Sequence, residues 1–91
     1  MYDITNYTKN KAKALGVTVQ PSTNKNKKID VFKGEKKVAS VGAAGMGDYP
    51  TYIREKGKKY ADERRVLYKA RHNKDRFIKG SPGFWSDNLL W

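Results

Sequence analysis

The stretch that decides the fold is residues 29–41, IDVFKGEKKVASV. Ile29 and Val31 share one face of a first strand, because alternate residues of a strand point to the same side. Gly34 lies in the middle of the stretch and can take the positive φ that tight hairpin turns need. A second alternating run then continues to Val41. The stretch therefore predicts a β-hairpin.

The hairpin needs further elements, because a lone hairpin is marginally stable in water. Val17 and Val19 alternate with a threonine and are predicted to form a third strand. A short helix over residues 9–15 is expected before it, capped by Thr8. Gly16 follows this helix, at the position where a left-handed glycine commonly ends a helix.

Two segments beside the hairpin are predicted to be connectors. Residues 22–28, STNKNKK, have no apolar residue and are expected to be a solvated loop, which completes a basic N-terminal arm over residues 1–28. Residues 42–47, GAAGMG, are rich in glycine but lack the Gly-Lys-Ser/Thr ending of a phosphate loop and the spacing of a dinucleotide fingerprint. They predict a flexible or tightly turning link.

Residues 50–73 are predicted to be helical in two parts. Pro50 stands near the first position of a short helix that Gly57 would end. Residues 58–73 form the strongest helical segment, because they contain two apolar pairs spaced by seven residues. These pairs are Tyr60 with Leu67 and Ala61 with Tyr68.

The C-terminal segment, residues 80–91, is the most apolar part of the chain. A turn is expected over residues 80–83, and Ser86 is expected to cap a final helical turn over residues 87–91. Apolar ends of a chain either close the protein's own core or insert into a partner. The predicted partner-interface residues are Phe84, Trp85, Leu89, Leu90 and Trp91.

These elements predict an α+β fold in one small domain over residues 1–91: a three-stranded antiparallel sheet packed on a basic helix, with an N-terminal helix and an aromatic C-terminal turn. The composition restricts its function. No apolar run reaches the length of a membrane span, and no apolar stretch resembles a secretory signal. The chain has no cysteine and one histidine, which excludes disulfides and cysteine-type metal sites.

Charge is the strongest functional signal in the composition. The chain has 20 lysines and arginines and 9 acidic residues, so its net charge is +11. Such an excess favours a polyanion or an acidic protein surface as the partner. Residues 54–79 hold 11 of the basic residues, interleaved with aromatic side chains. The predicted polyanion-binding residues are Arg64, Arg65, Lys69, Arg71, Lys74 and Arg76.

Catalysis has little support in the sequence. Asp30, Glu35 and Lys37 are spaced like a trace of a metal-dependent nuclease site, but a turn separates them within a few residues. His72 and Asn73 match half of a histidine-based nuclease motif, and the other ligands are missing. We therefore predict no catalytic residue, no metal, no cofactor and no enzymatic activity.

Three motifs resemble a family of small proteins encoded by large double-stranded DNA viruses of algae and amoebae, of the chlorovirus and giant-virus type. The motifs are KNKKIDVFKGEKKVASVG, DYPTYIREKGKKYADERRVLYKARHNKD and KGSPGFWSDNLLW, and the resemblance covers residues 9–91. Its most distinctive parts are residues 60–65 and 80–85. No activity is established for that family, so no residue role follows from it. The resemblance implies a virion component or a genome-associated protein.

The first functional hypothesis is a non-enzymatic viral structural protein, a minor capsid component that bridges other capsid proteins through the aromatic anchors. Its basic surface would face acidic capsid protein, the inner membrane surface or viral DNA. It would reside in the virion, and before assembly in the host cytoplasm or the virus factory. The alternative is a nucleic-acid-binding protein that contacts phosphates through the 54–79 region. A metal-dependent endonuclease is a distant third.

Overall fold

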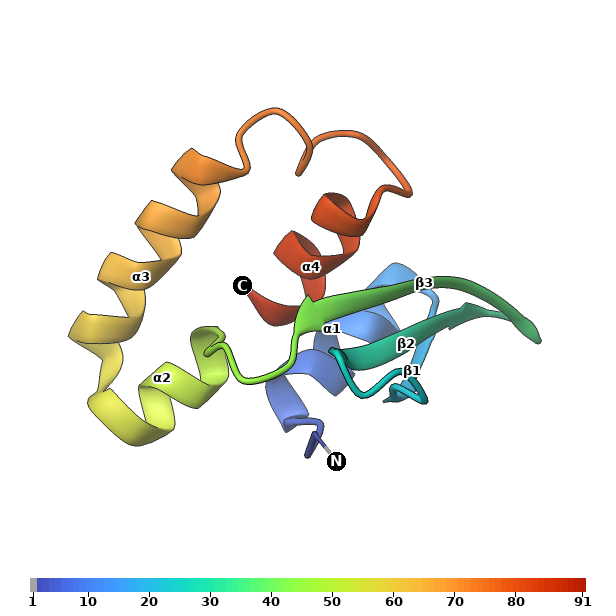
Figure 1. Cartoon of the computed structure of the whole chain (residues 1–91), viewed down its shortest axis with the longest axis horizontal. Helices are drawn as coiled ribbons and strands as arrows, with labels where there is room; N and C mark the ends of the chain where they lie inside the picture. The colour runs from blue at the N-terminus through green and yellow to red at the C-terminus, as the bar shows by residue number, and fades with distance from the viewer. Residues whose placement is uncertain (1) are drawn as a thin grey trace.

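A three-stranded antiparallel sheet in the order β1-β2-β3 forms one end of the molecule (Figure 1). The computed structural model describes residues 2–91; Met1, which the predicted domain includes, lies outside the described residues. The strands are β1 (Thr18–Pro21), β2 (Lys27–Lys33) and β3 (Lys36–Ala43). The predicted hairpin is thus confirmed, and so is a third strand, which begins at Thr18 and not at Val17 and includes Pro21.

The inward face of the hairpin supplies the centre of the core. Ile29 and Val31 are fully buried, and Val41 pairs with Ile29 across the sheet. Gly34 takes φ 64° in the turn, as its position predicted. Strand β2 begins at Lys27, two residues before the predicted start, so its pairing extends into the segment expected to be a loop.

The expectation that residues 22–28 are solvated is wrong for Lys28. This lysine lies in β2 and is 5% exposed. Its Nζ lies 2.9 Å from Oδ2 of Asp48, so a buried ion pair holds it in place. A buried charge is tolerated when it is paired in this way.

The N-terminal helix α1 (Asn6–Leu15) begins three residues before the predicted start. The cap is Thr5, whose Oγ1 accepts a hydrogen bond from the Thr8 amide at 3.3 Å. Thr8, predicted to be the cap, is buried inside the helix, and its hydroxyl donates to the Leu89 carbonyl at 2.8 Å. Gly16 ends α1 in the left-handed conformation, as predicted.

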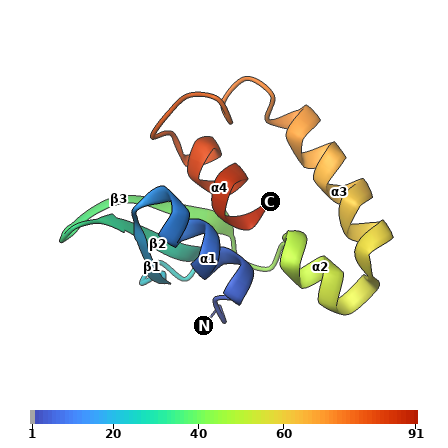
Figure 2. The ribbon, with the colours of Figure 1, turned by 180° about the vertical axis from the view of Figure 1, so that it is seen from behind.

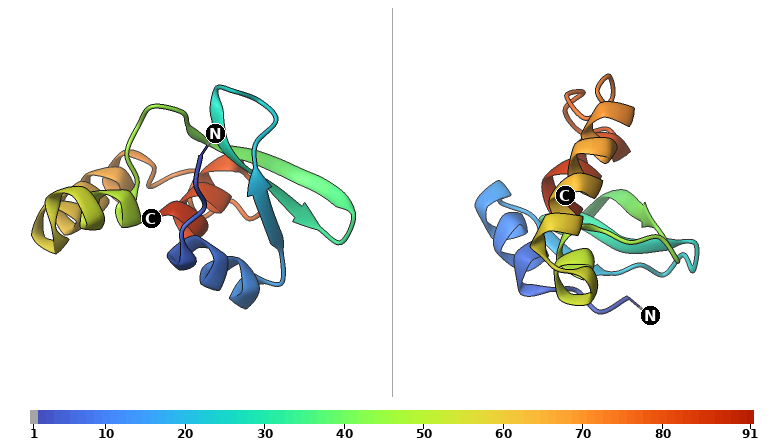
Figure 3. Two further views of the ribbon diagram at one scale, coloured as in Figure 1. Left: turned by 90° about the horizontal axis from the view of Figure 1, so that it is seen from below. Right: turned by 90° about the vertical axis from the view of Figure 1, so that its left-hand side faces the viewer.

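Helices α2 (Tyr49–Lys56) and α3 (Lys58–Arg71) form a pair at the end of the molecule away from the sheet (Figure 3). Asp48 caps α2, accepting from the Thr51 amide at 3.1 Å, and Gly57 separates the two helices as predicted. Only one of the two apolar pairs of α3 faces the core. Ala61 and Tyr68 are buried, whereas Tyr60 and Leu67 are exposed.

Helix α4 (Pro82–Leu90) corrects the prediction for the C-terminal segment. Residues 80–83 are not a turn that precedes a short helix at 87–91. Ser81 caps α4 by accepting from the Phe84 amide at 3.1 Å, and Pro82 occupies the first helical turn. Proline suits that position because the amide it lacks would have no helical partner.

Helices α1 and α4 lie against the sheet and enclose the core with it (Figure 2). Residues 2–91 thus form a small compact α+β domain with three strands and four helices. No helix in this part of the chain is long and apolar enough to cross a membrane. The buried apolar residues are Ala12, Val17, Ile29, Val31, Val41, Tyr49, Ala61, Tyr68, Leu89, Leu90 and Trp91.

Candidate nucleic-acid interface

The predicted anchors at the C-terminus lie mostly in the core of this chain. Leu89, Leu90 and Trp91 are at most 8% exposed, so in this fold they are not available to anchor a partner. The reason is that α4 packs on β3 and α1, which places its last turn at the centre of the molecule. Phe84 and Trp85 remain partly exposed.

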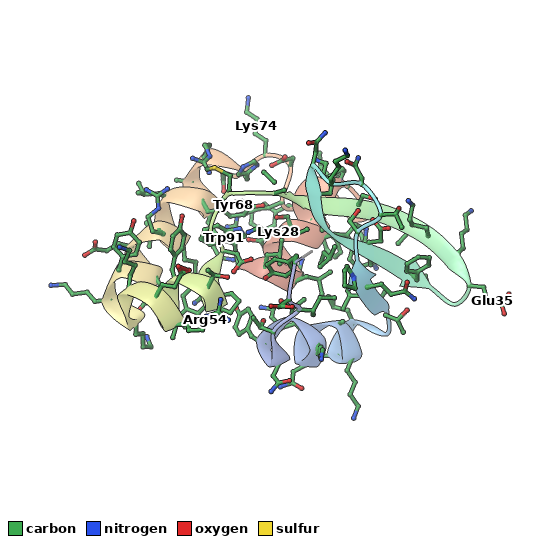
Figure 4. The ribbon with its side chains drawn as sticks, turned by 60° about the horizontal axis from the view of Figure 1, so that its bottom comes forward. Lys28, Glu35, Arg54, Tyr68, Lys74 and Trp91 are labelled. Carbon is green, nitrogen blue, oxygen red and sulfur yellow. The ribbon has the colours of Figure 1, made fainter. Side chains whose placement is uncertain are left out.

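Aromatic rings connect α3 to this last turn. The ring of Tyr68 stacks on that of Trp91 with centroids 4.6 Å apart and planes 10° apart. The other neighbour of Tyr68 is His72, whose ring centroid is 4.4 Å away. Tyr52 of α2 lies 6.0 Å from the Trp91 ring. The labelled side chains of Tyr68 and Trp91 lie next to each other in Figure 4.

Two of the predicted polyanion-binding residues neutralise a buried acid. The Nζ of Lys69 lies 2.8 Å from Oδ1 of Asp87, and Nη1 of Arg76 lies 3.7 Å from Oδ2 of the same residue. Asp87 is on α4 and is 8% exposed. Lys69 and Arg76 therefore help to hold α4 against the end of α3.

Arg65 connects three helices. Its guanidinium lies 3.5 Å from the centre of the Tyr49 ring, and Nη2 donates to the Tyr7 hydroxyl at 3.1 Å. Arg64 lies over the ring of Tyr52 at 5.8 Å. The Nε atoms of both arginines are buried without a partner among residues 2–91. Arg65 is thus chiefly structural.

Arg71 and Lys74 are the predicted polyanion-binding residues that remain exposed. Within residues 2–91 neither side chain forms a hydrogen bond or an ion pair, and Figure 4 shows Lys74 pointing away from the molecule. The structure thus divides the six predicted residues into two that are exposed and four that contact other parts of the chain.

Acids and bases are segregated between interior and surface. Fourteen of the 20 lysines and arginines are exposed, but only four of the 9 acidic residues are, counted over residues 2–91. Three of the remaining acids, Asp30, Asp48 and Asp87, are buried. The exposed surface is therefore almost as strongly positive as the whole chain.

Hydrogen-bond donors keep two of the buried acids, Asp48 and Asp30, ionised. Burial by itself raises the pKa of Asp48, but hydrogen bonds from the Thr51 amide and the Tyr2 hydroxyl, together with the Lys28 charge, bring it below its usual value. Burial likewise acts to raise the pKa of Asp30, and hydrogen bonds from Ser22 and Ser40 outweigh it, so that this pKa is also lowered.

The trace of a nuclease site is not assembled. Asp30 accepts hydrogen bonds at 2.6 Å from both Ser22 and Ser40, while Glu35 lies at the far tip of the hairpin (Figure 4). Lys37 is brought to 3.8 Å from Asp30, but about 10 Å of strand separates Asp30 from the turn that holds Glu35, so the two carboxylates do not share a metal. In the described part of the chain, no three metal-ligating side chains are grouped to hold an ion.

A cleft of about 540 Å³ lies between α3, α4 and the end of β3. Its aromatic lining consists of Tyr52, Tyr68, His72 and Trp91, and its basic lining includes Lys27, Arg64 and Arg71. Asp75 is an acidic residue on its wall.

A second, wider cleft of about 960 Å³ lies between α2 and the loops that flank the sheet. Lys25, Lys27, Arg54 and Lys56 are its basic residues at the surface, and its acidic ones are Asp3 and Glu55. Lys28, on its floor, is already paired with Asp48. The two clefts share Lys27, Lys28, Met46, Gly47 and Tyr52, so they adjoin.

The sequence analysis identified part of this lining, since Arg54, Lys56, Arg64 and Arg71 lie in the basic region 54–79, and it missed the part outside that region. Lys25 and Lys27 were assigned to a solvated loop, and Tyr52 was assigned no role. A charge count along the chain cannot find such a site, because the basic residues come from β2, α2 and α3. The chain matches no known protein family, curated protein or solved structure, so the resemblance to the viral family stays a prediction.

Proposed function

We propose that the chain is a non-enzymatic protein that binds nucleic acid through contacts to phosphate. The observation that carries this proposal is the segregation of charge: the bases are mostly exposed and the acids are mostly buried or paired. Such a surface attracts a polyanion over its whole extent and releases counterions when phosphates bind. Lys69 and Arg76 both pair with the buried Asp87, and neither is among the 14 exposed basic residues that carry this argument.

Nucleic acid is favoured over an acidic protein because aromatic side chains line the clefts beside the lysines and arginines. Tyr52 lies between the two clefts, and Lys27 contributes to both. A phosphate backbone needs the basic groups, and unstacked bases gain about 1–3 kcal/mol each from contact with aromatic rings. An acidic polypeptide would use only the basic groups and would leave the aromatic rings unused.

The experiment measures fluorescence anisotropy of labelled DNA and RNA as the chain is added, with polyglutamate as competitor. We expect binding of the nucleic acids at low salt, and displacement by polyglutamate only at a large excess of charge. If polyglutamate competes as well as nucleic acid at equal charge, the chain binds acidic surfaces in general and the proposal is wrong.

A second candidate is a structural role in a virion, as a minor capsid component. It is supported by apolar side chains that the fold leaves exposed on α3 and in the segment after it: Val66, Leu67, Phe77 and Ile78. Contacts with other capsid proteins would use these residues in place of the buried C-terminal ones.

Quantitative mass spectrometry of nuclease-treated virions distinguishes the two candidates. A fixed ratio to the major capsid protein that persists after genome release is expected for a capsid component. Release together with the DNA is expected for a genome-binding protein. Replacing Phe77 and Ile78 by serine should lower incorporation in the first case and leave it unchanged in the second.

A further inference from the structure

The two clefts adjoin at five shared lining residues, of which Met46 and Gly47 lie in the loop that follows β3. We define the basic groove by its exposed or partly exposed bases: Lys25, Lys27, Arg54, Lys56, Arg64 and Arg71. Three acids, Asp3, Glu55 and Asp75, also line it. The six basic residues outnumber the three acids two to one, so the groove carries a net positive charge.

Lys27 lies at the junction of the two clefts, because it lines both of them. Arg71 lines only the cleft beside α3, and Arg54 lines only the cleft beside α2. The positive charge is thus distributed along a path and is not concentrated at one point. A linear polyanion can contact all three positions at once, whereas a single small anion can contact one.

The cleft beside α3 has more aromatic side chains in its lining than the cleft beside α2. Its volume of about 540 Å³ falls in the range of sites that hold small organic ligands. Tyr52, His72 and Trp91 line it, and so does the apolar Leu67. A nucleobase has the flat shape and apolar faces that suit such a cavity.

Tyr52 packs between the clefts against the ring of Trp91, with centroids 6.0 Å apart. The end of its ring also lies close to the backbone of Gly47, in space that a Cβ atom would occupy. Tyr52 also packs edge-on against Tyr60, with centroids 5.3 Å apart. An aromatic wall that is already fixed loses little conformational freedom when a ligand binds.

We propose that the basic groove binds a single strand of nucleic acid, with its phosphates along Arg71, Lys27 and Arg54 and one base inside the cleft beside α3. This inference rests on the proposed function and specifies its ligand. A duplex does not fit the arrangement, because its bases are paired and stacked inside the helix and cannot enter a cavity. Bases of a single strand can turn outward and contact protein rings.

The test compares two triple variants of equal charge. The groove variant is Lys27→Gln, Arg54→Gln and Arg71→Gln, and the control is Lys9→Gln, Lys33→Gln and Lys36→Gln. All six side chains are exposed, and the three control residues line neither cleft. The probe is labelled oligothymidylate, and circular dichroism melts confirm that both variants fold.

We expect the groove variant to lose at least about tenfold in affinity and the control to lose much less. The slope of log affinity against log salt should become shallower by about 2 in the groove variant, since each phosphate contact on a single strand contributes about 0.7. Equal losses in both variants would overturn the groove assignment and leave nucleic-acid binding intact. A duplex bound as tightly as oligothymidylate would overturn the single-strand assignment.

Tryptophan emission reports on the cleft directly. Trp91 lines it, whereas Trp85 does not. In a Trp85→Phe variant, oligothymidylate should quench the remaining emission from Trp91, and the same variant with the groove substitutions should show little quenching at equal concentration. Binding without quenching would show that no base enters the cleft. Absence of any binding at low salt would instead contradict the proposed function itself.

Discussion

The indole of Trp91 lies flat against the ring of Tyr68, with centroids 4.6 Å apart and planes only 10° apart. This contact joins α3 to the last turn of α4. Both residues are buried in the core, yet both also line the cleft beside α3. The same aromatic pair therefore stabilises the fold and shapes the candidate binding site.

Replacing Trp91 by alanine should destabilise the fold. Removing a buried tryptophan costs about 3–5 kcal/mol, because it leaves a cavity and deletes its contacts. Denaturant titration measures the free energy of unfolding. Phe77→Ala is the control: its side chain is 66% exposed, and we expect a change within about 0.5 kcal/mol. Similar small effects in both variants would mean that Trp91 is not part of the core.

The buried ion pair of Lys28 and Asp48 predicts a large effect at the lysine. Lys28→Met leaves the Asp48 carboxylate with only its Tyr2 and Thr51 donors, and breaking such a pair costs about 3 kcal/mol. Lys37→Met is the matched control, because the Lys37 side chain is half-exposed and its Nζ lies 3.8 Å from Oδ2 of Asp30. The control should cost less than about 1 kcal/mol. Equal costs would contradict the account.

Stability should fall at acid pH. The pKa values of Asp30 and Asp48 are lower in the folded chain than the ordinary value of 3.8. The unfolded chain therefore binds more protons near that pH, so the stabilisation is complete above about pH 5 and is lost as the pH falls toward the folded pKa values. Unfolding measured from neutral to acid pH should show this decline. Asp48→Asn should make it shallower, and an unchanged curve would contradict the assignment.

A side chain at Gly42 should destabilise the fold. It has φ 84°, and an added Cβ would lie 2.8 Å from Cδ1 of Leu90 and 3.1 Å from Cβ of Lys28. Gly45 has φ 85° but no atom within 4 Å of an added Cβ, so Gly45→Ala measures the backbone strain alone, without a steric clash. Gly45→Ala should cost about 1 kcal/mol and Gly42→Ala about 1–2 kcal/mol more. Thermal melts compare them, and equal costs would show that α4 does not pack closely on β3.

Local sequence signals predicted the sheet and most helix boundaries. The alternation at Ile29 and Val31 and the glycine at position 34 place the hairpin, because strand period and turn chemistry are local properties. Gly16 and Gly57 likewise end helices where expected. The start of α4 was missed because a serine followed by a proline fits a turn as well as a helix cap.

The candidate site was less accessible from sequence, because it depends on contacts between distant segments. Nothing near Lys28 shows that Asp48 will neutralise it, and nothing near Lys69 shows that Asp87 will. Charge counting treated these lysines as free. The groove brings together β2, α2 and α3, which only the tertiary structure places side by side.

The most direct test of nucleic-acid binding is the salt dependence of oligothymidylate affinity for the unmodified chain. Each phosphate neutralised on a single strand contributes about 0.7 to the slope of log affinity against log salt. Contacts from all six basic residues of the groove would therefore give a slope of about −4. Nucleic-acid binding through the basic groove predicts a linear decrease with a slope near this value. A slope near zero, or no binding at the lowest salt, would contradict it.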